Sequence, residues 1–173
     1  MKLMSMLLVL LMFSACGYTP SAKFSREVVG ESISTSVKIS PIDPENTVII
    51  KDAVDSAIIE VFHASLTDKS NSQTHLAISL SNVSYTPVQY DKNGFVISYR
   101  ATTSLEIVRT TNGESKNYRT RGTYDFSIDP NSIITDRQRY IAIKGSSAKA
   151  IRSFVAQVSA EGAREKKGQK QEE

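Results

Sequence analysis

The 173-residue sequence has little of the chemistry that most enzymes need. It contains one cysteine, so an internal disulfide is excluded and the core alone must hold the fold. Its two histidines, His63 and His75, show no metal-ligand spacing. No GxSxG motif, glycine-rich phosphate loop or distinctive pair of carboxylates is present. We therefore expect no catalytic residues, no metal site and no cofactor.

A strong charge of one sign is also lacking. The formal net charge is +3, and loss of an N-terminal signal containing Lys2 would leave about +2. This near-neutral balance does not favour nucleic acid as a partner. After Phe13, no apolar run approaches the ~18 residues of a membrane-spanning helix. A mature chain would therefore be held at a membrane only through a lipid or a partner.

The N-terminus carries the most specific signal in the chain. Lys2 precedes an apolar run from Leu3 to Phe13, and two small residues then lead into Cys16. This layout is typical of a secretory signal with a small-residue cleavage site, and a cysteine directly after that site resembles the bacterial lipobox. We predict that residues 1–15 are a signal peptide and that Cys16 receives diacylglycerol and an N-acyl chain such as palmitate. An ordinary secretory signal and an uncleaved anchor are the alternatives.

Periodicity of apolar residues predicts the fold class. Alternation predicts strands, and spacing of three or four residues predicts helices. The expected strands lie at 33–40, 76–85, 95–107 and 118–126, and the expected helices at 48–66 and from Thr135 or Asp136 to 158. This order predicts an α+β fold in which two helices pack on one face of a four-stranded mixed, mostly antiparallel sheet.

Local signals add detail to this fold. Asn93-Gly94 and Asn112-Gly113 are typical of tight hairpin turns, and a β-bulge is expected near Asn82. Gly122, inside a strand, indicates close approach of another backbone, and the small residues 145–148 suit close packing of the last helix.

The same patterns divide the chain into four parts. They predict residues 1–15 as the signal, 16–31 as a lipidated tether, 32–160 as a single domain, and 161–173 as a disordered polar tail.

The order of these features resembles the LptE family, the lipopolysaccharide-assembly lipoproteins of the outer membrane. The residues that carry the resemblance are Cys16-Gly17-Tyr18, the strand leading into an amphipathic helix, Asn93-Gly94, Tyr99-Arg100, Leu105, Ile107 and the Ala/Ile-rich helix Ile141–Val158. The resemblance extends from Cys16 to Ala160.

What the resemblance implies is a role in contact rather than catalysis. It implies a domain that sits in the lumen of an LptD-type β-barrel, plugs it, assists its assembly and binds lipopolysaccharide during delivery to the cell surface. The protein would be anchored by lipid at the periplasmic face of the outer membrane. The alternative is a free-standing periplasmic lipid-binding or envelope lipoprotein, which a cavity among Leu76, Ile78, Tyr99 and Leu105 would favour.

Basic residues at loop tips and on strands are the candidates for lipopolysaccharide binding. Lipid A carries phosphates, which Arg and Lys contact through charge-assisted hydrogen bonds. The candidates are Lys92, Arg137, Arg139, Arg100, Arg119 and Arg121, of which the resemblance favours Lys92 and Arg137. The alternative is that all six are ordinary solvated charges.

The sequence also predicts what each of the two faces of the sheet contacts. The aromatic residues Phe95, Tyr99, Tyr118, Tyr124 and Phe126 are expected to pack in the core rather than to form a lipid-binding surface. The opposite face, rich in Ser and Thr, is expected to meet the polar wall of a barrel lumen.

Overall fold

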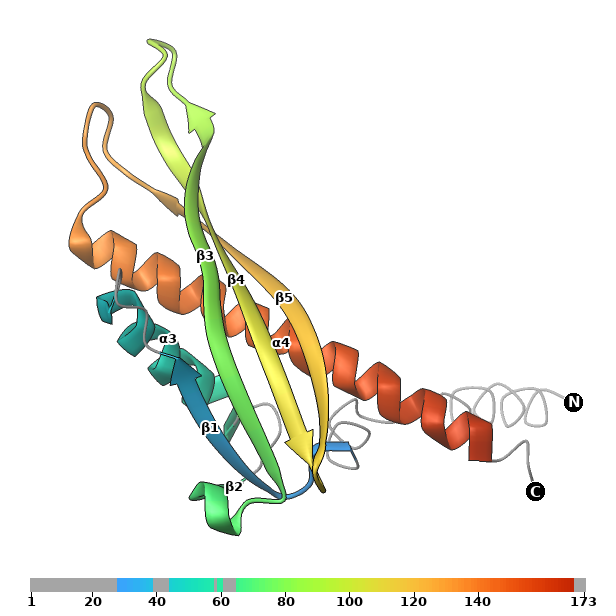
Figure 1. Cartoon of the computed structure of the whole chain (residues 1–173). Helices are drawn as coiled ribbons and strands as arrows, with labels where there is room; N and C mark the ends of the chain where they lie inside the picture. The colour runs from blue at the N-terminus through green and yellow to red at the C-terminus, as the bar shows by residue number, and fades with distance from the viewer. Residues whose placement is uncertain (1–27, 39–43, 58, 61–64, 170–173) are drawn as a thin grey trace, which may run out of the picture.

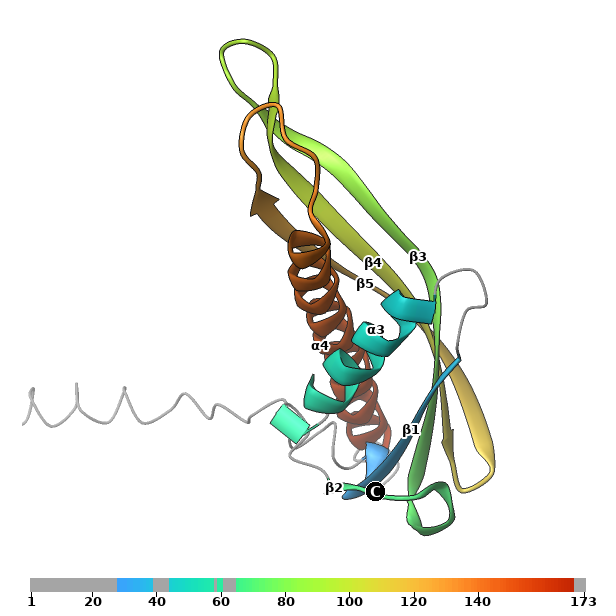
Figure 2. The same cartoon turned by 90° about the vertical axis from the view of Figure 1, so that its left-hand side faces the viewer.

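A computed structural model describes residues 28–38, 44–57, 59–60 and 65–169. One mixed sheet is covered on one face by two helices (Figure 1, Figure 2). The elements in order are β1 (Ser32–Lys38), α3 (Pro44–Ala57), β2 (Ser65–Leu66), a short 3₁₀ helix η2 (Lys69–Asn71), β3 (Thr74–Tyr90), β4 (Val96–Thr111), β5 (Glu114–Ser127) and α4 (Asp136–Gln169). Five of our sequence predictions concern residues outside this range: the signal, Cys16, tether residues 16–27, His63 and tail residues 170–173.

The sheet has the strand order β2-β1-β3-β4-β5. β1 is parallel to β2 and β3, whereas β3, β4 and β5 are antiparallel neighbours. The α+β class and the placement of both helices on one face are confirmed. The prediction of four strands is wrong, because Ser65–Leu66 forms a fifth. Two residues are too few to show alternation, and this strand is held by backbone bonds such as that from Ser65 N to Glu31 O, 2.9 Å.

The first helix begins earlier than its apolar spacing predicted. α3 starts at Pro44, a residue that suits the first turn of a helix because its missing N–H has no partner there anyway. Ile50 and Val54 bury their side chains in the core. Leu66, the last residue of the predicted helix, lies in β2 instead.

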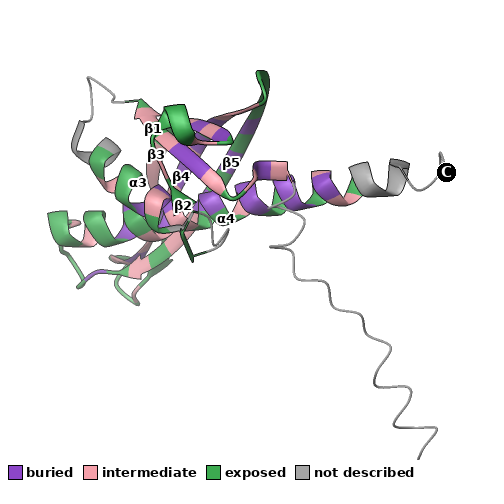
Figure 3. Cartoon of the chain, turned by 90° about the horizontal axis from the view of Figure 1, so that it is seen from below, coloured by how far each residue is buried: buried purple, intermediate pink, exposed green. Residues whose placement is uncertain are grey.

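The core lies between the inner face of the sheet and the two helices, as the burial colouring shows (Figure 3). Strands contribute Ile33, Leu76, Ile78, Leu105 and Ile107, and helices contribute Ile50, Val54, Ile143, Ile151, Phe154 and Val158. Val29 also belongs to this cluster and is fully buried. Residues 28–31 are therefore part of the domain, which corrects the predicted end of the tether.

The hairpin turns and the bulge follow the sequence signals. Asn112 and Gly113 form a two-residue turn with φ angles of 52° and 84°, as Asn-Gly favours. In the other turn, a carboxylate oxygen of Asp91 accepts the N–H groups of Asn93 and Phe95 at 2.8 Å. The pairing of β3 with β4 shifts register between Leu80 and Asn82, so the expected bulge is confirmed.

A capping box starts α4. Thr135 Oγ1 accepts the N–H of Gln138 at 3.3 Å, and Gln138 Oε1 accepts the N–H of Thr135 at 3.0 Å. Most of the predicted apolar face is buried: Ile143, Ser147, Ala150, Ile151, Phe154 and Val158. Tyr140, whose spacing from Ile143 and Ser147 would place it on the same face, is exposed because the first turns of α4 extend past the sheet (Figure 1).

The second helix also runs past its predicted end. α4 continues to Gln169, so the prediction of a disordered tail is wrong for residues 161–169. Glu161 explains the continuation, because its carboxylate is bonded to side chains of β4 and β5. The next residue, Gly162, is buried, so the helix is still covered at this point. Because residues 161–169 are mostly polar, their sequence pattern did not indicate that Glu161 would hold the helix against β4 and β5.

Close packing of α4 on β5 depends on Gly122. A Cβ at this position would collide with the backbone of Ser146 and Ala150. Nearby, Gly145 lies under the ring of Tyr124, and the buried hydroxyls of Thr103 and Ser146 are 2.7 Å apart. The close approach at Gly122 and the small-residue contact at 145–148 are confirmed.

We expect Gly122→Ala to lower the free energy of unfolding by about 1–3 kcal/mol, the range for overpacking a tight core. Urea denaturation followed by circular dichroism measures this change. Thr123→Ala is the matched control, because Thr123 lies on the opposite face of the same strand. Equal stability of the two variants would contradict the close contact between strand and helix.

Candidate functional site

Two segments far apart in sequence form one end of the molecule, which we call the distal end. They are the turn region of the β3–β4 hairpin, residues 88–96, and residues 128–141, which join β5 to α4 and include its first turns. In both side views the hairpin projects beyond every other element, and the loop before α4 lies toward the same end (Figure 1, Figure 2). β2 and η2 lie at the opposite end.

Exposed apolar side chains concentrate at the distal end. Among described residues, six of nine exposed large apolar side chains lie there: Val88, Tyr90, Phe95, Ile133, Tyr140 and Ile141. Ile133 is the extreme case, with 85% of its surface exposed. Apolar groups gathered in this way indicate an interaction surface rather than scattered surface residues.

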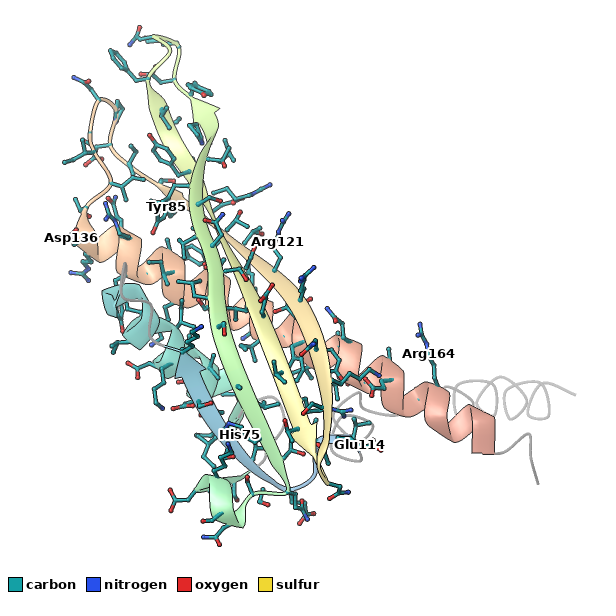
Figure 4. The ribbon with its side chains drawn as sticks, in the orientation of Figure 1. His75, Tyr85, Glu114, Arg121, Asp136 and Arg164 are labelled. Carbon is teal, nitrogen blue, oxygen red and sulfur yellow. The ribbon has the colours of Figure 1, made fainter. Side chains whose placement is uncertain are left out.

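Three of the six predicted basic candidates lie at the same end. Lys92 is in the hairpin turn, and Arg137 and Arg139 are in the first turn of α4; all three are exposed. They form no ion pair with any described residue. They are not side by side, because the hairpin turn lies well beyond Asp136, where α4 begins (Figure 4). A ligand that touched all three would have to be extended.

A half-buried aromatic cluster supports the hairpin below its tip. The ring centroid of Phe126 lies 6.2 Å from that of Tyr85 and 6.1 Å from that of Tyr99. Of the aromatic residues expected in the core, Tyr118 is buried against Phe154. Phe95 is exposed, so its assignment to the core is wrong, because it follows the turn where no helix covers the hairpin.

The other three basic candidates lie on the outer face of the sheet, opposite the helices. Arg100 forms a bidentate pair with Asp125, with both N–O distances at 2.7 Å. This hydrogen bond raises the pKa of Arg100 and lowers the pKa of Asp125. Arg119 Nε lies 3.2 Å from a carboxylate oxygen of Glu106. Arg121 forms no ion pair with any described residue. The fold thus separates these three candidates from the distal end.

A second charged cluster lies near the other end of α4, centred on Glu161. Its carboxylate oxygens accept bonds from Arg109 at 2.9 Å, Lys116 at 2.8 Å and Tyr118 at 2.7 Å. Arg109 also donates to the Val28 carbonyl at 3.2 Å. Our sequence analysis missed this cluster. The available signal was the alternation of β4, which places Arg109 on the buried face with Leu105 and Ile107 and so requires an acidic partner.

Hydrogen bonds to Glu161 set its charge state. Burial alone would raise the pKa of its carboxyl group, but hydrogen bonds from Lys116 and Tyr118 and the charge of Arg109 outweigh burial and lower it. Glu161 is therefore ionised in the folded state and joins α4, β4 and β5.

The remaining titratable candidate is His75. Its Nδ1 lies 2.8 Å from Ser34 Oγ and its Nε2 lies 3.0 Å from Ser36 Oγ. Burial, and then the charge of Lys69, lower its pKa. No group of three metal-ligating side chains occurs in the described part of the chain. His75 is thus a residue of β3 whose ring lies within hydrogen-bond distance of two serines of β1.

The fold and these surfaces define a class of protein: a small α+β domain whose distinctive features are contact surfaces. The chain belongs to the LptE family, described as lipopolysaccharide-assembly, whose model matches residues 34–158. This family consists of non-enzymatic lipoproteins of the Gram-negative envelope, and the chain is a lipopolysaccharide-assembly lipoprotein. No helix among the described residues has the length and apolar character required to cross a membrane.

The chain is similar to solved structures of several other bacterial proteins. A chain from Caulobacter crescentus CB15, described as a lipoprotein, has a TM-score of 0.54 at 11% identity; the match covers 83% of this chain and 98% of that one. Protein XCC0632 from Xanthomonas campestris has a TM-score of 0.50 at 12% identity, with 79% and 87% covered. Rare lipoprotein B from Shewanella oneidensis has 0.42 at 13%, with 80% and 96% covered. No curated protein sequence matches.

We expect Glu161→Gln to lower the free energy of unfolding at neutral pH by roughly 1–3 kcal/mol, because hydrogen bonds to a charged group are lost. The folded-state pKa of Glu161 lies below its ordinary value of 4.5. Its contribution is therefore complete above that value and is lost as pH falls through the folded-state pKa. Thermal melts across this range measure it. An identical loss of stability on acidification in wild type and variant would contradict this role.

Proposed function

We propose that this lipopolysaccharide-assembly lipoprotein occupies the lumen of an LptD-type β-barrel in the outer membrane, plugs it, assists its assembly and binds lipopolysaccharide at the distal end. Membership of the LptE family supports the general role. The observation that carries the binding site is the combination of unpaired cations and exposed apolar side chains at one end of the domain.

This combination suits an amphiphile with phosphate groups. Lys and Arg bind phosphates by charge-assisted hydrogen bonds, while exposed residues such as Tyr90, Phe95 and Ile133 offer apolar surface to acyl chains. Lys92 and Arg137 lie on separate segments toward one end. Lipid A, which has phosphates and several acyl chains, is large enough to use such separated contacts.

The outer face of the sheet supports the barrel contact. Its side chains are mostly short and polar, and the lumen of a transmembrane β-barrel is itself polar. A contact between two such surfaces would be hydrogen-bonded and wet rather than apolar. In this proposal the lipid on Cys16 holds the domain at the periplasmic face of the outer membrane, and the sheet gives specificity.

The packing of the core bears on the alternative of a free-standing lipid-binding protein. That alternative expected a cavity among Leu76, Ile78, Tyr99 and Leu105. Leu76, Ile78 and Leu105 each expose about 1% of their surface and belong to one packed cluster. Tyr99 lies against Phe126 instead. A solid core at this place favours the barrel-associated role.

We expect the double variant Lys92→Glu/Arg137→Glu to bind lipopolysaccharide about tenfold or more weakly, because two phosphate contacts become repulsive. Binding of the full-length protein in detergent to immobilised lipopolysaccharide measures this. Lys69→Glu/Arg152→Glu makes the same change in charge away from the distal end and serves as the control. Equal binding by both variants would remove the distal site and leave the barrel role in place.

We expect Cys16→Ala to move the protein from the outer membrane to the soluble periplasmic fraction without unfolding it. The core cluster is built from described residues that begin at Val29, so we expect the domain to fold without the lipid. Fractionation and circular dichroism measure the two effects. This variant should still capture the barrel from detergent extracts, and a loss of folding would contradict the separation of anchor and domain.

A further inference from the structure

The outer face of the sheet has an unusual composition for a solvated surface. Register and alternation place short hydroxyl side chains across its centre: Ser79, Ser81, Ser84, Thr102, Ser104 and Thr123. Such side chains lose little rotamer entropy when they are covered, and each can donate and accept a hydrogen bond. Such a face can pack against another polar surface with a small loss of side-chain entropy and with its hydrogen bonds satisfied.

The charges on this face are nearly balanced within the chain. Along the β4–β5 pair, successive outward-facing positions match Glu106 with Arg119, Ser104 with Arg121, Thr102 with Thr123 and Arg100 with Asp125. The first and last of these matches are ion pairs. Arg121 stands between them, opposite a serine, and forms no ion pair with a described residue. One guanidinium is thus left over at the centre of the hydroxyl-rich face.

The bulge in β3 makes room beside this guanidinium. Ser81 is skipped in the pairing, since Leu80 pairs with Leu105 and Asn82 with Ser104. A shallow hollow of about 340 Å³ lies here, and Ser81, Ser104 and Arg121 are among its lining residues. Figure 4 shows Arg121 on the side of the sheet away from α4. The hollow therefore combines hydrogen-bonding hydroxyls with one unpaired positive charge.

We propose that this hollow receives the carboxylate of an Asp or Glu side chain from the lumen wall of the LptD-type barrel, with Arg121 as its ion-pair partner. The inference rests on the function proposed above and names the contact that fixes the sheet face in the barrel. A guanidinium binds a carboxylate through two parallel hydrogen bonds. When the two surfaces meet, exclusion of water strengthens this pair.

The occupant is a carboxylate rather than a lipid phosphate for a reason of charge and shape. Arg119 is already paired with Glu106, so the hollow holds one net positive charge, which matches one carboxylate. A phosphate bearing more negative charge would lie within reach of the Glu106 carboxylate, which also lines the hollow. The hollow is shallow and open to solvent, which suits a side chain that projects from a facing wall.

Capture of the barrel tests this contact. The tagged, lipidated protein is expressed with the LptD-type barrel of the same genome and extracted in mild detergent. We expect Arg121→Glu to reduce recovery of the barrel at least tenfold. Arg152→Glu, the same reversal at an exposed position on α4, should leave recovery unchanged. Circular dichroism of both variants confirms that they fold.

Photo-crosslinking identifies the partner residue. A photo-reactive amino acid at Thr123, next to the hollow, should crosslink to a barrel peptide that contains Asp or Glu. Replacing that carboxylate by Lys should restore recovery of the barrel by the Arg121→Glu variant. If Arg121 only stabilised the fold, the charge swap would not restore recovery of the barrel.

The outcomes separate this inference from the function on which it rests. If wild type recovers no barrel, the proposed function fails and the contact fails with it. If wild type and Arg121→Glu recover the barrel equally, the contact is wrong and the function stands. Equal losses in Arg121→Glu and Arg152→Glu, or failure of the charge swap, also overturn it. So does a loss of lipopolysaccharide binding in Arg121→Glu with normal recovery of the barrel.

Discussion

The close contact between β5 and α4 at Gly122 is the constraint on which the arrangement of this domain depends. Because Gly122 has no Cβ, the helix backbone at Ser146 and Ala150 lies directly against the strand. The buried Ser146 hydroxyl is hydrogen-bonded in this interface to Thr103 and to the carbonyl of Ala142, the latter at 2.8 Å. A larger residue at Gly122 would lift the helix and break this bond. The distance of α4 from the sheet is therefore set by the contact between Gly122 and the helix backbone at Ser146 and Ala150.

The consequences of that contact extend to both ends of α4. At its start, the cap at Thr135 fixes where the loop from β5 returns, and so where Arg137 and Arg139 stand. At its other end, Glu161 meets Arg109, Lys116 and Tyr118. The middle of α4 packs closely on the sheet and its two ends make polar contacts, so this one helix links the core to the distal end.

Periodicity predicted what depends on many residues together. Strong local signals mark the long strands, both helices and the two Asn-Gly turns, and together these elements indicate the layered α+β class. Gly122 inside a strand indicated the close approach of another backbone, which is that of α4. Features formed by only one or two residues could not be predicted from periodicity, because they are too short to show a pattern. β2 has two residues, Val29 enters the core alone, and Glu161 is anchored by partners far away in sequence.

The candidate site shows the same division. Sequence pattern placed basic residues on tips and outer faces correctly, because alternation fixes which side of a strand a residue faces. It did not show that Arg100 and Arg119 have acidic partners while Arg121 has none in the part of the chain that the structure describes, since pairing depends on register between strands. Nor did it show that Val88, Tyr90 and Phe95 would be exposed beside Lys92, because this requires knowing where the covering helices stop.

The hairpin tip has a mechanical consequence. β5 ends at Ser127, opposite Ser98, so beyond that pair only β3 and β4 remain. Their pairing there is interrupted by register shifts between Pro87 and Tyr90, and an isolated two-stranded ribbon is only marginally stable. The aromatic rings of Tyr85, Tyr99 and Phe126 form a firm base below it. The tip is therefore held by two strands alone, so a change in its shape need not disturb the core below the aromatic base.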